Sequence, residues 1–185
     1  MRPNEALFSF QSTPRKTSGF TAVELMVVIA IVAILGALAV PSFSDVVGRY
    51  RVRRAAEDLS RTLSLARTEA IRRGGRILVA PIPSIPDTCI GGSDGAWNCG
   101  WMIAFDANGN KTFDTGDTII QTSSRPVGVS ATSSKNIVAL DGWGQINGLG
   151  AYSFQLGDLS TPLRFPLKIC VNSGGRIRTT EGTEC

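Results

Sequence analysis

The sequence predicts an α+β protein in which one long N-terminal helix is packed on an antiparallel β-sheet. The chain has no strong helix breaker between Pro41 and Gly74, and an apolar run precedes this stretch. From Arg76 onward, short apolar segments alternate with turns rich in Gly, Pro, Asn, Asp and Ser, which is typical of antiparallel strands. A length of 185 residues allows one modest domain with an appendage. The helix is therefore expected to cover the sheet.

The apolar run begins directly after a polar leader, residues 1–19. Residues 25–40 carry no polar side chain, and with residues 20–24 the run is long enough for one bilayer crossing at about 1.5 Å per residue. A secretory signal would place its small-residue cleavage site after the apolar stretch, whereas Gly19 stands before it. An ordinary signal anchor would explain the run but not the carboxylate of Glu24, because a charge in hydrocarbon is costly and usually has a partner.

Residues 19–26, GFTAVELM, resemble the prepilin cleavage motif of type IV pilins and type II secretion pseudopilins. The resemblance implies the type IV pilin fold, in which the first half of the helix spans the membrane. It also implies that a prepilin peptidase cuts after Gly19 and N-methylates Phe20. By the same resemblance, Glu24 pairs with the N-terminal amine of a neighbouring subunit during assembly. Pro41 stands where the first helix of the family often carries a proline.

One helix is predicted from residue 20 to residue 73, with Pro41 as the place for a kink. Gly48 is its weak point, at a cost of about 1 kcal/mol relative to Ala. The Gly74-Gly75 pair is a natural stop. Apolar residues recur at steps of four and three along one face, which must pack against the rest of the domain. They are Val52, Ala56, Leu59, Leu63, Ala66 and Ala70.

The arginine-rich polar side of this helix allows three interpretations. We favour a solvated face with pairs such as Glu57 with Arg53 and Arg61. The alternatives are juxtamembrane charges that hold the helix on the cytoplasmic side, and a surface that binds anionic lipid or DNA. In each case the expected organisation is a leader (1–19), a transmembrane and assembly half of the helix (20–48), and a periplasmic globular domain (49–185).

Seven strands are predicted after the helix. Their short length and spacing favour antiparallel pairing, and no internal repeat interrupts them. They are expected at residues 76–80, 101–105, 118–122, 136–140, 151–156, 167–171 and 176–179.

All four cysteines follow the apolar run, which fits an oxidising periplasm. Four cysteines allow three pairings. We favour Cys89–Cys99 and Cys170–Cys185, because each bridge then tethers a glycine-rich segment with little core of its own. The second bridge would contribute about 3 kcal/mol to stability. A zinc site is the rival, but the chain has no histidine and no CxxC pair, so no metal site is expected.

An oxygen-rich segment follows the strand expected at residues 101–105. Its D-x-N-x-N turn and later D-x-G-D resemble a segment typical of the GspH/FimT group of minor pilins and pseudopilins. Asp106, Asn108, Asn110, Asp114 and Asp117 also have the spacing of a calcium loop. Such a loop requires glycine at its sixth position, where this chain has a lysine. An Asx-rich hairpin turn needs the same residues for backbone hydrogen bonds, and we favour the turn.

The C-terminal segment carries the candidate binding residues. Gly175-Arg176-Ile177-Arg178 resembles the G-R-x-R tail motif of FimT-type minor pilins that bind DNA during natural transformation. In an extended strand the two arginines point to one face, about 7 Å apart, and straddle neighbouring phosphates. Lys168 is expected to assist them. The alternative is a solvated edge strand whose charges prevent edge-to-edge aggregation. Two nearby carboxylates, of Glu181 and Glu184, weaken an anion site.

Catalytic machinery is not expected. The commonest general base is missing because histidine is absent, and no nucleophile elbow or phosphate-binding loop occurs. No cofactor is expected either. The favoured function is therefore a minor pilin that binds DNA non-specifically for uptake in natural transformation. The alternative is a structural minor pilin that primes pilus assembly, or a type II secretion minor pseudopilin, without DNA binding.

These interpretations share one cellular setting. The expected partners are other pilins or pseudopilins, a prepilin peptidase, the inner membrane and, for the favoured function, DNA. The protein is expected to cross the inner membrane once with its C-terminal domain in the periplasm. It then enters a pilus or pseudopilus at the cell surface. The net charge of +4 agrees with DNA binding without deciding it.

Overall fold

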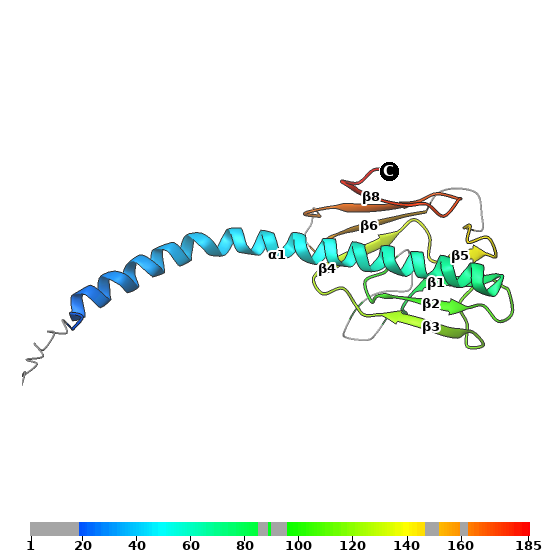
Figure 1. Cartoon of the computed structure of the whole chain (residues 1–185), viewed down its shortest axis with the longest axis horizontal. Coiled ribbons are helices and arrows are strands. Elements are labelled where there is room, and N and C mark those ends of the chain that lie inside the picture. Colours follow the sequence, from blue (N-terminus) through cyan, green and yellow to red (C-terminus); the bar gives the residue numbers. More distant parts are fainter. Residues whose placement is uncertain (1–18, 85–88, 90–95, 147–151, 160–162) are drawn as a thin grey trace, which may run out of the picture. The chain divides into compact units, whose positions relative to one another are not determined.

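The structure is a computed structural model that describes residues 19–84, 89, 96–146, 152–159 and 163–185, without the side chains of residues 38–42. The chain divides into two compact units, Met1–Ser42 and Phe43–Cys185. One helix, α1 (Ala22–Arg73), contributes to both and is continuous through Pro41 (Figure 1). The kink at Pro41 and the domain boundary after residue 48 stay predictions. Most of the leader, residues 1–18, lies outside the described residues.

The first unit contains the beginning of α1. Its apolar side chains are exposed from Phe20 to Leu35. Within the described residues, no helix is both long and apolar enough to cross a membrane. The expected crossing at residues 20–40 includes positions 38–40, whose side chains lie outside the described residues.

In the second unit, the apolar face of α1 is the centre of the core. All six residues of the predicted face are buried, from Val52 to Ala70. Thr62 is the polar exception on this side: its hydroxyl donates to the Asp58 carbonyl (3.0 Å) and accepts from the indole N–H of Trp101 (3.1 Å). The 3.6-residue periodicity therefore identified the packing face correctly.

Eight strands form two four-stranded antiparallel sheets, in the orders β3-β2-β1-β5 and β4-β6-β7-β8. Side chains of both sheets pack with α1 in one core, in which Trp97 and Phe154 meet edge to face at 4.9 Å. The strands are β1 (Gly75–Pro81), β2 (Trp101–Phe105), β3 (Thr118–Ser123), β4 (Val129–Ser133), β5 (Val138–Asp141), β6 (Tyr152–Asp158), β7 (Leu167–Val171) and β8 (Ile177–Glu181).

The strand predictions need three corrections. Two sheets replace the single expected sheet. Strand β4 was missed because its sequence, VSATS, is small and polar, although Val129 and Ala131 alternate into the core. Strand β8 begins at Ile177, so Arg176 belongs to the hairpin connection rather than to the strand.

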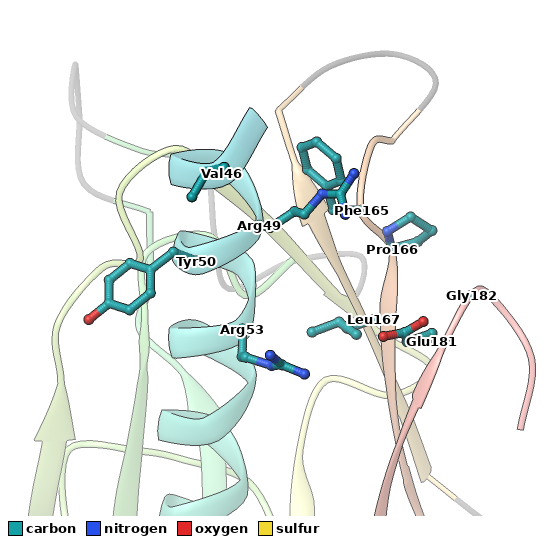
Figure 2. A pocket seen from close by; sticks show the side chains of 9 residues that line it. All are labelled: Val46, Arg49, Tyr50, Arg53, Phe165, Pro166, Leu167, Glu181 and Gly182. Atoms are coloured by element: carbon teal, nitrogen blue, oxygen red, sulfur yellow. The ribbon is translucent and has the colours of Figure 1, made fainter. Parts of the chain in front are cut away.

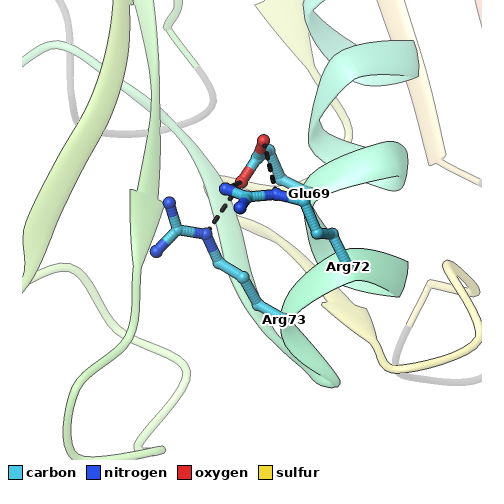
Figure 3. A network of polar contacts seen from close by, with 3 residues as sticks. All are labelled: Glu69, Arg72 and Arg73. Atoms are coloured by element: carbon cyan, nitrogen blue, oxygen red, sulfur yellow. Dashed lines mark hydrogen bonds and ion pairs between the residues drawn. The ribbon is translucent and has the colours of Figure 1, made fainter.

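The end of α1 combines a glycine stop with a charged cluster. Gly74 adopts φ +75°, a left-handed conformation that ends helices. Glu69 accepts two hydrogen bonds from Arg72 (2.7 and 3.2 Å) and one from Arg73 (2.8 Å) (Figure 3). These hydrogen bonds hold the pKa of Glu69 below its ordinary value, with Arg72 the larger cause. The positive charges also suit the negative end of the helix dipole.

Candidate functional site

The antiparallel pairing of β7 with β8 gathers the predicted DNA-binding residues on one face. Lys168 pairs with Thr180, and Cys170 pairs with Arg178. The Asn172 N–H donates to the Arg176 carbonyl (3.2 Å), which continues the same register through the hairpin. Since side chains alternate along a strand, Lys168 and Arg178 lie on the face opposite to the buried side chain of Ile169. Arg176, two residues before Arg178, continues this outer face.

Both arginines are accessible. The side chains of Arg176 and Arg178 are exposed, and neither forms an ion pair with a described residue. Glu181 does not neutralise them, because alternation along β8 places it on the other face. There it lines a groove of about 500 Å³ beside α1, facing Arg53 (Figure 2). One of the two carboxylates expected to weaken the anion site therefore points away from it.

Lys168 is more constrained than the sequence suggests. It is half-buried, and its ammonium donates to the Thr183 carbonyl at 2.7 Å. The disulfide Cys170–Cys185 lies next to this contact, with a Cα–Cα distance of 5.9 Å. The Thr180 hydroxyl adds a hydrogen bond to the Glu184 carbonyl (3.0 Å). The C-terminal residues are thus fastened to the hairpin, and Lys168 contributes to that fastening.

The connection before Arg176 is fixed from both sides. The Gly175 N–H donates to the Asn172 carbonyl (2.9 Å), and the Arg176 N–H donates to the Asn172 side chain (2.8 Å). Gly175 has φ +75°, and a Cβ there would lie 2.7 Å from the Gly144 carbonyl oxygen. From α1, the guanidinium of Arg67 donates to the Gly175 carbonyl (3.2 Å). This role of Arg67 was not predicted from the sequence, because no local pattern reveals so distant a contact.

Two other basic side chains near the hairpin, Arg49 and Arg164, already have partners. Figure 2 shows Arg49 beside Phe165 in the groove next to α1, and its guanidinium lies 4.9 Å from the ring centroid. Arg164 lies at the same distance from this ring and forms an ion pair with Asp45. The second disulfide, Cys89–Cys99, has a Cα–Cα distance of 5.5 Å and lies outside this region of the sequence.

The acidic segment after β2 forms the predicted Asx-rich turn. Asp106 accepts hydrogen bonds from the backbone N–H groups of Gly109 (2.6 Å) and Lys111 (2.8 Å). Asp114 accepts from the Gly116 N–H and from the side chains of Asn108 and Asn110, which together hold the pKa of its carboxyl below the ordinary value. Asp117 accepts from the Ala107 and Asp114 N–H groups. Among the described residues, no three or more His, Cys, Asp or Glu side chains lie together in a way that could bind a metal ion.

At the other end of the chain, Glu24 caps its own helix. The Glu24 N–H donates to the Thr21 hydroxyl (3.2 Å), and the Thr21 N–H approaches the Glu24 carboxylate at 3.5 Å. This is the capping box of a T-x-x-E sequence, so Glu24 has hydrogen-bond partners at the start of its own helix, and its role in assembly stays a prediction. Gly19 and Phe20 precede the helix and are exposed, so the expected cleavage site is accessible.

Comparison with known sequences supports both ends of this description. Residues 55–175 match the family model described as type II transport protein GspH, and residues 14–40 match the prokaryotic N-terminal methylation motif. Two fimbrial proteins of Pseudomonas aeruginosa are each 42% identical over 65 residues, covering 35% of this chain and 42% of each relative. The prepilin peptidase-dependent protein D of Escherichia coli (strain K12) is 38% identical over 84 residues, covering 43% of this chain and 48% of that relative. The chain therefore matches less than half the length of these curated relatives.

Comparison with solved structures extends the likeness to the fold. Two crystal structures of the type IV minor pilin FimU of Pseudomonas aeruginosa (strain PAO1) superpose with TM-scores of 0.56 and 0.53. They cover 74% and 72% of this chain, and 96% and 98% of the FimU chains, at 16% identity. At this identity the likeness shows the fold alone. The GspH match ends at residue 175, immediately before Arg176.

Proposed function

The chain belongs to the GspH family and is a minor pilin of a type IV pilus or pseudopilus, and on this premise we propose that it binds DNA through its β7–β8 hairpin. The observation that carries the proposal is the pair of exposed arginines, Arg176 and Arg178, without an ion-pair partner among the described residues. Membership of a structural pilin family gives no reason to propose catalysis.

The chemistry of the two guanidiniums fits phosphate. Each guanidinium donates two parallel hydrogen bonds to an anionic oxygen pair, and alternate residues of an extended chain lie about 7 Å apart. Phosphate contacts position a protein on DNA without reading its sequence. The expected binding is therefore non-specific, and it serves the uptake of DNA in natural transformation. Lys168 supplies longer-range charge rather than a direct contact, because its ammonium binds Thr183.

Assembly strengthens this binding. Pilin family membership implies association with other pilins and prepilin processing. We place the cleavage between Gly19 and Phe20, with methylation of Phe20, and we assign Glu24 to pairing with the amine of a neighbouring subunit. Before assembly the subunit would reside in the inner membrane with its globular domain in the periplasm. Two arginines make a weak site, but several subunits in one filament raise the effective affinity.

A purely structural minor pilin is the second candidate, whether it primes pilus assembly or belongs to a type II secretion pseudopilus. It is favoured by one observation: the GspH match covers residues 55–175 and omits the arginine tail. Measuring DNA binding by the double variant Arg176→Gln, Arg178→Gln separates the two functions. DNA binding through the hairpin predicts a lower affinity than that of the wild type, whereas a purely structural role predicts no difference between the two proteins.

A further inference from the structure

One tryptophan stands apart from the other two. Trp143 is 81% exposed, whereas Trp97 and Trp101 are 0% and 1% exposed in the core. Single exposed apolar residues are normal on protein surfaces, so exposure alone assigns no role. A role for Trp143 is suggested by the rigid turn that carries it and by the β7–β8 hairpin next to that turn.

The turn that carries Trp143 is held tightly. The Asp141 carboxylate accepts hydrogen bonds from the N–H groups of Trp143 and Gln145, each 2.9 Å long. The Asp141 carbonyl accepts from the Gly144 N–H (3.0 Å), and the Asp141 N–H donates to the Gln145 carbonyl (2.9 Å). The indole therefore projects from a fixed backbone. The negative charge of Asp141 is directed to the N–H groups of its own turn.

This turn lies directly against the arginine hairpin. The Ile146 N–H donates to the Ser173 carbonyl (3.2 Å), which joins the segment after β5 to the β7–β8 connection. The Gly144 carbonyl lies so close to Gly175 that no Cβ would fit between them. Figure 1 shows the yellow segment after β5 close to this hairpin, at the end of α1. Trp143 precedes Gly144 and Arg176 follows Gly175, so the two side chains start from adjoining turns.

An exposed aromatic ring beside guanidiniums is the combination that binds single-stranded nucleic acid. The ring stacks on a base while the cations hold the backbone. In an intact duplex the faces of the bases are already stacked, so the ring can reach only an unpaired base. We propose that Trp143 stacks on an unpaired base of a DNA strand whose phosphates Arg176 and Arg178 hold. This inference rests on the proposed function and adds to it a preference for single-stranded DNA.

Trp143 provides its own probe, because the other two tryptophans are buried. Full-length protein in detergent micelles is titrated with oligodeoxythymidine and with a blunt duplex, following tryptophan fluorescence and binding of labelled DNA. Oligodeoxythymidine should quench the exposed tryptophan, and Trp143→Phe should abolish the quenching while retaining most of the affinity. Trp143→Ala should bind oligodeoxythymidine about 5- to 100-fold more weakly and bind the duplex as the wild type does. Val127→Ala, which truncates another exposed apolar side chain, is the matched control.

The outcomes separate this inference from the proposed function. If Trp143→Ala binds oligodeoxythymidine like the wild type, while Arg176→Gln, Arg178→Gln loses affinity, stacking is refuted and DNA binding stands. If the arginine variant also binds like the wild type, or if no DNA is bound, the proposed function is refuted as well. If Trp143→Ala instead lowers incorporation into filaments with DNA binding intact, the indole contacts a neighbouring pilin and the stacking proposal is wrong.

Discussion

The guanidinium of Arg67 on α1 donates a hydrogen bond to the Gly175 carbonyl oxygen, 3.2 Å away, across 108 positions of sequence. The contact connects the helix of the core to the residue before Arg176. It therefore determines where the first arginine of the tail is presented. Arg67 is half-buried, so in the proposed function it positions the tail rather than binding phosphate.

Replacing Arg67 by Met should show whether Arg67 positions the arginine tail or contacts DNA phosphate itself. The variant keeps an apolar stem beside Gly144 but loses the hydrogen bond to the Gly175 carbonyl. We expect DNA affinity to fall about 2- to 10-fold, because a hydrogen bond from a charged group contributes on the order of 1.5 kcal/mol or less when part-exposed. The slope of log affinity against log salt should stay unchanged, since the phosphate contacts are the same. A reduced slope would mean that Arg67 itself binds phosphate.

The disulfide Cys170–Cys185 should matter for DNA binding, whereas Cys89–Cys99 should not. The first bridge closes the segment whose Thr183 carbonyl binds Lys168. Cys170→Ala, Cys185→Ala should lower the free energy of unfolding by about 3 kcal/mol and weaken DNA binding. Cys89→Ala, Cys99→Ala is the matched control: it should also lose stability but bind DNA normally. Equal DNA binding by the two variants would show that the C-terminal fastening is irrelevant to the site.

Glu24 caps its own helix, and this role can be separated experimentally from the assembly role that we propose for it. Glu24→Gln retains an oxygen for the Thr21 N–H but removes the charge, whereas Thr21→Ala removes the hydroxyl cap and keeps the charge. We expect Glu24→Gln to enter filaments poorly and Thr21→Ala to enter them nearly normally. Intact mass should show both variants cleaved after Gly19 and methylated on Phe20. Normal incorporation of Glu24→Gln would remove the assembly role.

The Asx-rich turn should make stability depend on acidic pH. The pKa of Asp114 is lowered in the folded state, so its contribution is complete above the unfolded pKa. The contribution is lost as the pH falls through about 4 toward the folded pKa. Urea unfolding should therefore show the wild type approaching Asp114→Asn in stability as the pH falls from about 6 to about 3. Glu184→Gln, at the exposed C-terminal end, is the control. A constant difference between wild type and Asp114→Asn over this range would show that the Asp114 charge does not stabilise the turn.

Local patterns predicted the elements of this fold well. The apolar periodicity from Val52 to Ala70 identified the buried face of α1, and Gly74 identified its end. Alternation found seven of the eight strands but not β4, whose small polar sequence is set in place by its partner β6. The capping box of Glu24 was readable from the T-x-x-E spacing. The apolar residues around Glu24 instead indicated a buried charge that needs a partner on another subunit.

Long-range relationships could not be predicted in the same way. The division of the strands into two sheets depends on pairing between segments far apart in sequence. The contacts of Arg67 with Gly175, and of Ile146 with Ser173, depend on how those sheets meet α1. The sequence likewise offered no sign that Lys168 binds the Thr183 carbonyl. The exposed arginines of the tail could be identified from sequence, but the scaffold that positions them could not.

The most direct test of the central claim is duplex DNA binding by the full-length protein in detergent micelles, measured by fluorescence anisotropy over a range of salt concentrations. The wild type should bind without sequence preference, with a log–log salt slope of about −0.9 for each phosphate contact. The double variant Arg176→Gln, Arg178→Gln should bind DNA more weakly. The magnitude of its salt slope should be smaller by about two phosphate contacts, and its unfolding transition should be unchanged. Arg54→Gln, Lys111→Gln removes the same charge elsewhere on the surface and should bind nearly as the wild type does. Absence of binding at low salt, or wild-type binding by the tail variant, would contradict DNA binding through the hairpin and leave the structural pilin.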